Sequence, residues 1–130
     1  NKKKKINQII DMQKKKTGKL FNFCLYAVGV VANLKTREKF FLSKLGEEIG
    51  LLFQLADDFL DKKGSKYLIG KQVKKDNKKG KSTLLNLMGE KKAYLYANNL
   101  KKKILLKLKK HGKKAKEITS TIEFILERKF

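Results

Sequence analysis

The chain has 130 residues, an apolar content of 41% and a formal net charge of +22 at neutral pH. It is long enough for one domain with a core. No stretch can span a bilayer, because Glu47, Glu48, Asp57 and many lysines interrupt the apolar runs. All but two of the 34 basic residues are Lys, spread over almost every polar segment, whereas nucleic-acid recognition favours Arg. We therefore expect no nucleic-acid partner and no stable membrane anchor.

The single cysteine, Cys24, excludes an intrachain disulfide framework. This fits a reducing compartment, so we expect the protein to be cytoplasmic. Cys24 lies in an apolar run, and a free cysteine in such a run is usually buried. We expect it to be a small core residue. His111 has no partner for a metal site in the sequence.

Helical periodicity runs through the whole chain, and no strand-like alternation is present, so the sequence predicts an all-α fold. In the first helix the apolar stripe starts at Ile6 and Ile9 and is continued by the polar Gln13. The mostly apolar second helix is fit for burial on most of its sides. The helices are expected at residues 6–13, 16–34, 36–61, a short one opened by Ser82 or Thr83, 90–112 and 114–129.

Three boundaries have specific signals. Thr36 can cap the third helix at its N-terminus. Gly64 and the polar residues after it indicate that this helix ends near Asp61 and that a long loop covers 61–81. Gly112 is typical of a helix C-terminus.

The third helix carries an unusual acidic stripe. Gln54, Asp57, Asp58 and Asp61 stand at i, i+3, i+4 and i+7 and so share one side of a helix. Like charges at this spacing destabilise a helix, and the helix dipole disfavours anions at a C-terminus. One interpretation is an ordinary exposed helix end screened by lysines. The other is a Mg²⁺ site, since Mg²⁺ takes carboxylate oxygens and completes its shell with waters and phosphate oxygens.

Three lysines favour the second interpretation. Lys16, Lys71 and Lys81 each stand close to a Gly or a helix-capping residue. An acidic stripe that binds Mg²⁺, together with positioned lysines, would neutralise a diphosphate from two sides. Each lysine considered alone is still more typical of a solvated surface residue.

Several segments together resemble one known family. "IGLLFQLADDFLD" (49–61) resembles the second aspartate-rich motif of the trans-isoprenyl diphosphate synthases, the polyprenyl synthetase family. Order and spacing agree over residues 8–129, and "KTGKL" and "GKST" are most similar to the bacterial farnesyl diphosphate synthase (geranyltranstransferase) branch. The other matching segments are "KTGKL" (16–20), "IGK" (69–71), "GKSTLLNLMG" (80–89) and "FILERK" (124–129).

The resemblance implies a role for each matching acidic or catalytic position. Asp57 would be a direct Mg²⁺ ligand, with Asp58 and Asp61 completing the metal site directly or through waters. Thr17 and Gln54 would lie near the C1 carbon of the allylic substrate, where the cation forms and a proton is lost.

The resemblance also implies the substrate-binding residues. Lys16 and Lys71 would bind the allylic diphosphate, and Phe53 would line the prenyl pocket. Asp76 and Lys81 would belong to the outer part of the metal and phosphate site. Arg128 would lie near isopentenyl diphosphate. The Lys-rich loop after Asp61 and Leu84, where the family often has an aromatic residue, depart from the family pattern.

As a whole, the resemblance implies a Mg²⁺-dependent prenyltransferase of isoprenoid biosynthesis. Such an enzyme condenses an allylic diphosphate (dimethylallyl or geranyl) with isopentenyl diphosphate, and the full-length form is expected to be a homodimer. The family also has a first "DDxxD" motif, and none occurs before Asp57. Residues 1–130 are therefore expected to be the C-terminal half of the catalytic helical bundle, inactive by itself. Product chain length and allylic substrate preference are not fixed by this sequence.

A different class of function stays open at this point. The basic amphipathic segment "LKKKILLKLKKHGKK" (100–114) is compatible with a helical interaction protein that binds anionic membrane or RNA. Such binding would be lost at high salt and indifferent to Asp57. It leaves the acidic stripe without an explanation.

Overall fold

The structure is a computed structural model that describes residues 2–69 and 83–128, without the side chains of 2–4, 63 and 65–69. Every element it describes is helical, which confirms the all-α prediction. Lys71, Asp76 and Lys81 lie outside the described residues. The elements are α1 (Lys2–Gln13), the π-helical turn η1 (Lys14–Gly18), α2 (Lys19–Val31), α3 (Thr36–Ile69), α4 (Leu84–Met88), α5 (Glu90–Lys109), the 3₁₀ turn η2 (Gly112–Ala115) and α6 (Lys116–Ile125).

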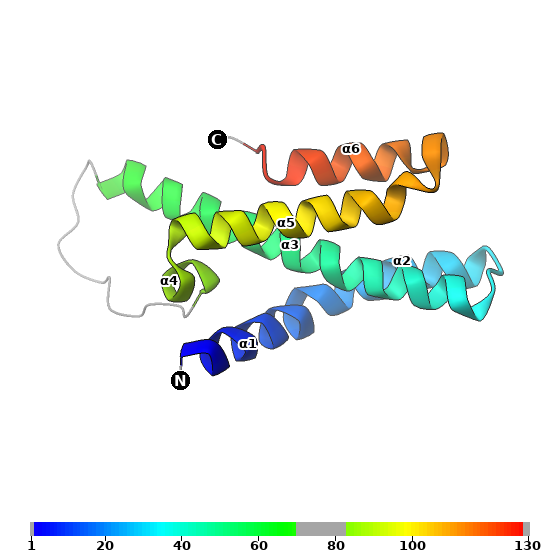
Figure 1. The fold of residues 1–130 in the computed structure, drawn as a ribbon, viewed down its shortest axis with the longest axis horizontal. Helices are drawn as coiled ribbons and strands as arrows, with labels where there is room; N and C mark the ends of the chain where they lie inside the picture. Colours follow the sequence, from blue (N-terminus) through cyan, green and yellow to red (C-terminus); the bar gives the residue numbers. More distant parts are fainter. Residues whose placement is uncertain (1, 70–82, 129–130) are drawn as a thin grey trace.

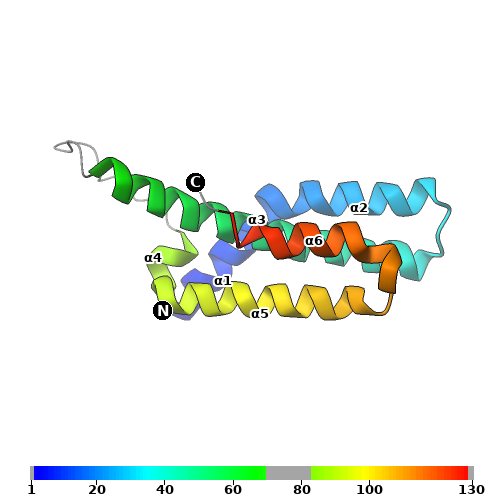
Figure 2. The ribbon, with the colours of Figure 1, turned by 90° about the horizontal axis from the view of Figure 1, so that it is seen from above.

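The long helix α3 is the centre of the fold. Helix α2 runs antiparallel along its first half, and α5 and α6 form an antiparallel pair against it (Figures 1 and 2). Helix α1 meets α2 at an angle at η1 and passes under α3. The core is apolar, and its fully buried side chains come from four helices: Leu45, Leu51, Leu52 and Leu55 of α3, Leu84 of α4, Ile104 of α5 and Ile122 of α6.

Glycines allow the α2 and α3 backbones to approach closely. A Cβ atom on Gly46 would lie 2.5 Å from the carbonyl oxygen of Phe21, and one on Gly50 would lie 2.7 Å from Cα of Gly18. Real Cβ atoms do not occupy such positions, so both sites require glycine. This close contact fixes the position of η1, and therefore of Thr17, relative to α3.

Helix α3 continues eight residues beyond the end that the sequence indicated. It ends at Ile69, and Gly64 lies within it without a positive φ. The prediction of a helix end near Asp61 is therefore wrong, because a single glycine costs only about 1 kcal/mol in a helix interior. The three aspartates lie about two to three turns before Ile69, where the described helix ends. The repulsion between the neighbouring aspartates therefore remains. The unfavourable effect of the helix dipole does not apply, because it is confined to the last turn of a helix.

The other helix ends agree in part with the sequence. Thr83 caps α4, since its side chain accepts a hydrogen bond from the Asn86 backbone N–H at 3.2 Å. Gly112 has a left-handed φ of 54° after α5, as predicted. Thr36 is itself the first helical residue, one position inside the cap that we expected it to form. The Glu38 carboxylate accepts the Lys35 backbone N–H there, at 3.0 Å.

Cys24 is exposed, and the prediction of burial is wrong. Helix α2 packs against α3 along one stripe, which includes the partly buried Phe21 and Leu25. On other sides of α2 large apolar side chains are exposed, among them Phe23 at 67% and Val31 at 88%. Apolar composition showed that α2 could be buried on most sides, but burial depends on which elements lie beside it.

Helix α5 places its apolar side in the core. Ile104 and Leu108 are buried, while Lys107 binds both carboxylate oxygens of Glu48 on α3 at 2.8 and 2.7 Å. The stripe that a membrane-binding segment would use therefore contributes to the core. Over the part of the chain that the structure describes, no helix is long and apolar enough to cross a membrane.

Candidate functional site

A chain of polar side chains connects α1, η1 and α3 at the acidic stripe. The Thr17 hydroxyl donates to Oε1 of Gln54 at 3.0 Å. Nε2 of Gln54 lies 3.5 Å from Oδ1 of Asp58, a long hydrogen bond, and Nε2 of Gln13 donates to Oδ2 of Asp58 at 3.2 Å. Both oxygens of the Asp58 carboxylate therefore face an amide donor. The sequence predicted Thr17, Gln54 and Asp58 for one site, and the structure brings them together.

Thr17 reaches α3 because of the π-helical turn in which it lies. The turn η1 covers Lys14–Gly18, where the sequence indicated a helix break. Gly18 is buried against the backbone of Glu47. A π-turn rotates the residues that follow relative to a regular α-helix, and such turns are frequent at functional sites. Here it directs the Thr17 hydroxyl at Gln54.

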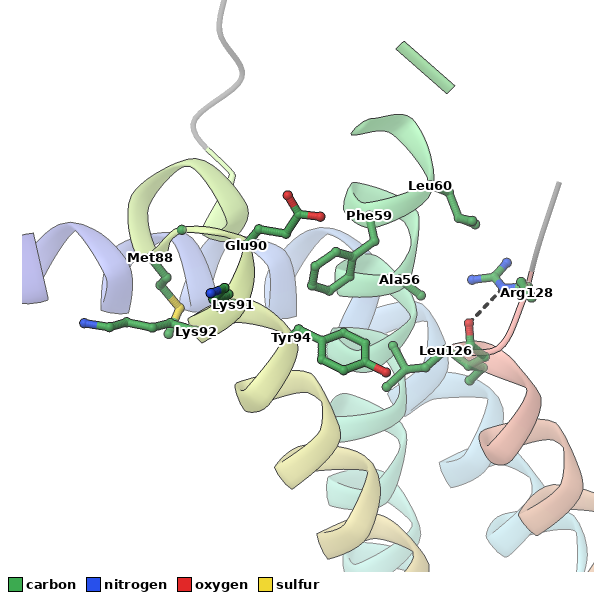
Figure 3. A pocket seen from close by; sticks show the side chains of 12 residues that line it. Ala56, Phe59, Leu60, Met88, Glu90, Lys91, Lys92, Tyr94, Leu126 and Arg128 are labelled. Carbon is green, nitrogen blue, oxygen red and sulfur yellow. Dashed lines mark hydrogen bonds between the residues drawn. The ribbon is translucent and has the colours of Figure 1, made fainter. Parts of the chain in front are cut away.

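Asp57 has a different environment from Asp58. Its Oδ1 forms an ion pair with the Arg128 guanidinium at 3.2 Å. The same guanidinium lies 4.7 Å from the ring centroid of Phe53. Its Nε donates to the carbonyl of Ile125 at 3.1 Å, which is the dashed line at Arg128 in Figure 3. Phe53 is partly buried and packs against Phe21, with 5.6 Å between ring centroids. Arg128 thus joins the end of α6 to the acidic stripe.

The environment of Asp58 makes ionisation of its carboxyl less favourable than in water. Burial is the main cause that raises the pKa of this carboxyl above its usual value, and the neighbouring Asp61 and Asp57 add to the increase. The hydrogen bonds from Gln13 and Gln54 oppose the shift without cancelling it. Added positive charge near Asp58 would therefore be stabilising.

The three aspartates do not form a closed metal cage. Asp57 faces Arg128, Asp58 faces the two glutamines, and Asp61 is exposed. Within residues 2–69 and 83–128 no three His, Cys, Asp or Glu side chains are placed to hold a metal ion together. The arrangement fits Mg²⁺ only as an ion that takes one or two carboxylates and completes its shell with water and phosphate oxygens.

One predicted residue, Lys16, stands apart from these contacts. Lys16 is exposed on η1, and none of the contacts described above includes it. Gln13 was missed as a site residue, although its polar side chain continues an apolar stripe, which was the available signal. It is 4% exposed, and its Oε1 is buried without a partner. An unpaired buried acceptor costs roughly 1–3 kcal/mol.

A cavity of about 890 Å³ adjoins this site on the Arg128 side (Figure 3). It lies between α3, the start of α5 and the end of α6, and Gln54 and Asp58 do not line it. Its walls are mostly apolar, with a few charged side chains. The lining residues are Ala56, Phe59, Leu60, Met88, Gly89, Glu90, Lys91, Lys92, Tyr94, Ile125, Leu126 and Arg128.

The all-helical array, with aspartates and amides on one long central helix, has the fold of a solved isoprenoid synthase. The structure superimposes on a solved isoprenoid synthase family member from Thermotoga neapolitana with a TM-score of 0.73 and 28% identity, covering 95% of this chain and 40% of the other. The polyprenyl synthetase family model matches residues 1–125. The chain belongs to the polyprenyl synthetase family.

Two curated relatives extend the comparison. A farnesyl diphosphate synthase of Bacillus subtilis (strain 168) is 35% identical over 94 residues, which are 70% of this chain and 32% of the relative. A short chain isoprenyl diphosphate synthase of Methanocaldococcus jannaschii is 32% identical over 120 residues, 92% of this chain and 36% of the relative. The chain therefore spans about a third of the length of these relatives.

Proposed function

We propose that this chain forms part of a Mg²⁺-dependent short-chain prenyltransferase that condenses an allylic diphosphate with isopentenyl diphosphate. The observation that carries the proposal is the convergence of Thr17 of η1 with Gln54 and Asp58 of α3, directly beside the Asp57–Arg128 pair. The resemblance to the family motifs implies a metal-site role for Asp57 and Asp58 and a place near C1 for Thr17 and Gln54. The names of the relatives give the reaction class.

In this proposal the chain provides one carboxylate wall of the site, as the C-terminal half of the catalytic bundle. Mg²⁺ held by Asp57 and Asp61 would neutralise the diphosphate and so stabilise the departing group. Asp58, whose oxygens already face two amides, would contribute through waters. Lys16 and Lys71 would bind the allylic diphosphate, with Asp76 and Lys81 at the outer edge of the site.

The remaining residues act on the organic part of the substrates. The Gln54 and Thr17 oxygens form a fixed dipolar pair that would face the developing cation at C1. Phe53 would be an apolar wall for the prenyl chain. Arg128 would contribute positive charge for isopentenyl diphosphate, after releasing Asp57 to the metal.

The first test measures ligand binding by this chain. Inorganic pyrophosphate with Mg²⁺ should increase hydrogen-exchange protection over residues 52–62, because a ligand that binds the ordered form stabilises it. Mg²⁺ alone should change little. Asp57→Asn should abolish the increase, whereas Asp11→Asn, which alters an exposed aspartate of α1, should preserve it. Protection that is unchanged by Mg²⁺ with pyrophosphate would refute the site.

The second test addresses the reaction. In a protein that contains the complete synthase fold, Asp57→Asn should leave the fold intact and strongly reduce prenyl transfer. Prenyl transfer at the wild-type rate would mean that the acidic stripe is only a structural feature of α3.

A further inference from the structure

The polar network leaves one buried residue without an explanation. Gln13 is the one buried polar side chain among the residues that the structure describes, at 4% exposure. It occupies the last position of α1, next to the core residue Ile9 in the apolar stripe. A buried amide with an unpaired oxygen is unfavourable for stability. An apolar residue of similar size would fit the stripe without that cost.

The orientation of the Gln13 amide is determined by its neighbour. With Nε2 directed at Asp58, the amide donates to Oδ2 at 3.2 Å, and Oε1 is the atom left without a partner. A rotation by 180° would bring two acceptor oxygens together and leave the amide nitrogen unpaired. The hydrogen bond to Asp58 therefore fixes the orientation of the Gln13 amide, and this orientation leaves Oε1 unpaired.

The position of the Asp58 carboxylate in turn affects the pair formed by Gln54 and Thr17. Asp58 is held at Oδ2 by Gln13, and its Oδ1 faces the nitrogen of Gln54. This leaves the Gln54 oxygen directed at the Thr17 hydroxyl, at 3.0 Å. The bond between Gln54 and Asp58 is long at 3.5 Å, so the carboxylate must itself be fixed if it is to orient the amide.

We propose that Gln13 is a positioning residue, which fixes the Asp58 carboxylate and through it the orientation of the Gln54 side-chain amide toward Thr17. The role of this orientation in prenyl transfer rests on the proposed function. The orientation of the Gln54 amide by Gln13 and Asp58 is independent of that function. Gln13 itself need not touch substrate, since it acts two hydrogen bonds away from the Gln54 oxygen.

The test follows the Gln54 side-chain amide by ¹⁵N NMR in the 130-residue chain, without substrate or metal. Gln13→Met keeps the apolar stripe and the size of the side chain but removes the donor. The Gln54 amide protons should shift toward the positions of an exposed glutamine, and the order parameter should fall below about 0.6, the range of flexible groups. The matched control is Gln8→Met on the same helix, at an exposed position, which should leave the Gln54 signals unchanged.

The unfolding free energy separates positioning from a merely structural role. Gln13→Met removes the unpaired oxygen but also the donor to Oδ2 of Asp58; these two effects oppose each other, so the unfolding free energy should change little. Lower stability with unchanged Gln54 signals would overturn the proposal.

A second variant, Gln13→Asn, keeps an amide that is one methylene too short to reach Asp58, and should release Gln54 in the same way. If neither variant folds, Gln13 is a folding residue and the proposal is wrong. A released Gln54 in a chain that fails to bind Mg²⁺ with pyrophosphate would refute the proposed function alone.

Discussion

The same substitution, glycine to alanine, should have opposite effects at two positions of α3. At Gly64 an added Cβ would have no atom within 4 Å, and the residue lies inside a helix without a positive φ. Alanine is favoured over glycine in a helix interior by about 1 kcal/mol. We therefore expect Gly64→Ala to stabilise the protein by about that amount.

At Gly46 the added Cβ would lie 2.5 Å from the Phe21 oxygen and 2.8 Å from Cα of Asn22. Carbon contacts are favourable only at about 3.5–4.0 Å, and the obstructing atoms are backbone, so α2 would have to move away by roughly 1 Å. Because the obstructing backbone atoms cannot rotate aside, we take the upper end of the overpacking cost, about 3 kcal/mol, and the helix propensity gain of about 1 kcal/mol offsets part of it. We expect a net loss of about 2 kcal/mol, so that the two variants differ by about 3 kcal/mol.

Urea unfolding followed by far-ultraviolet circular dichroism measures both values, with equal m-values required for a direct comparison. A destabilised Gly64→Ala would show that Gly64 adopts a conformation that only glycine tolerates, and that α3 ends there. A neutral Gly46→Ala would show that α2 does not pack against α3 as closely as described. Either result would refute the arrangement on which the position of Thr17 depends.

Three further predictions concern side-chain contacts. Lys107→Met should lower the free energy of unfolding, measured in urea, by about 1–2 kcal/mol. The reason is that it removes the side chain that binds both oxygens of the largely buried Glu48 carboxylate. The matched control is the exposed Lys109→Met, which should change the free energy of unfolding by less than about 0.5 kcal/mol. Burial acts to raise the pKa of Glu48, but hydrogen bonds from Lys107 and Lys103 outweigh it and lower the pKa below its usual 4.5. The native state therefore binds the Glu48 proton less tightly than the unfolded state does. The stabilisation is present above pH 4.5 and is lost as the pH falls through the lowered pKa. Glu48→Gln should therefore reduce the slope of the unfolding free energy against pH in that acid range. In a protein with the complete synthase fold, Phe53→Ala should raise KM for the allylic diphosphate more than it changes the Mg²⁺ dependence, and equal losses in both would argue against a prenyl pocket at this ring.

The sequence by itself determined the helical class, the family and most of the residues that meet at the site. Periodicity placed Gln54 and Asp58 on one side of a helix, and the family motifs added Thr17. These properties depend on residue type and spacing along a single helix, which the chain order carries directly.

Tertiary structure decided how those residues are used. Asp57 and Asp58 are adjacent in the sequence, but they point about 100° apart around α3, so Arg128 of the α6 end meets the first and Gln13 of α1 meets the second. The exposure of Cys24 likewise depends on the single side from which α3 covers α2. A helical pattern specifies which side chains share a face, but the polar partner or the solvent that meets each face is set by the packing of elements distant in the sequence.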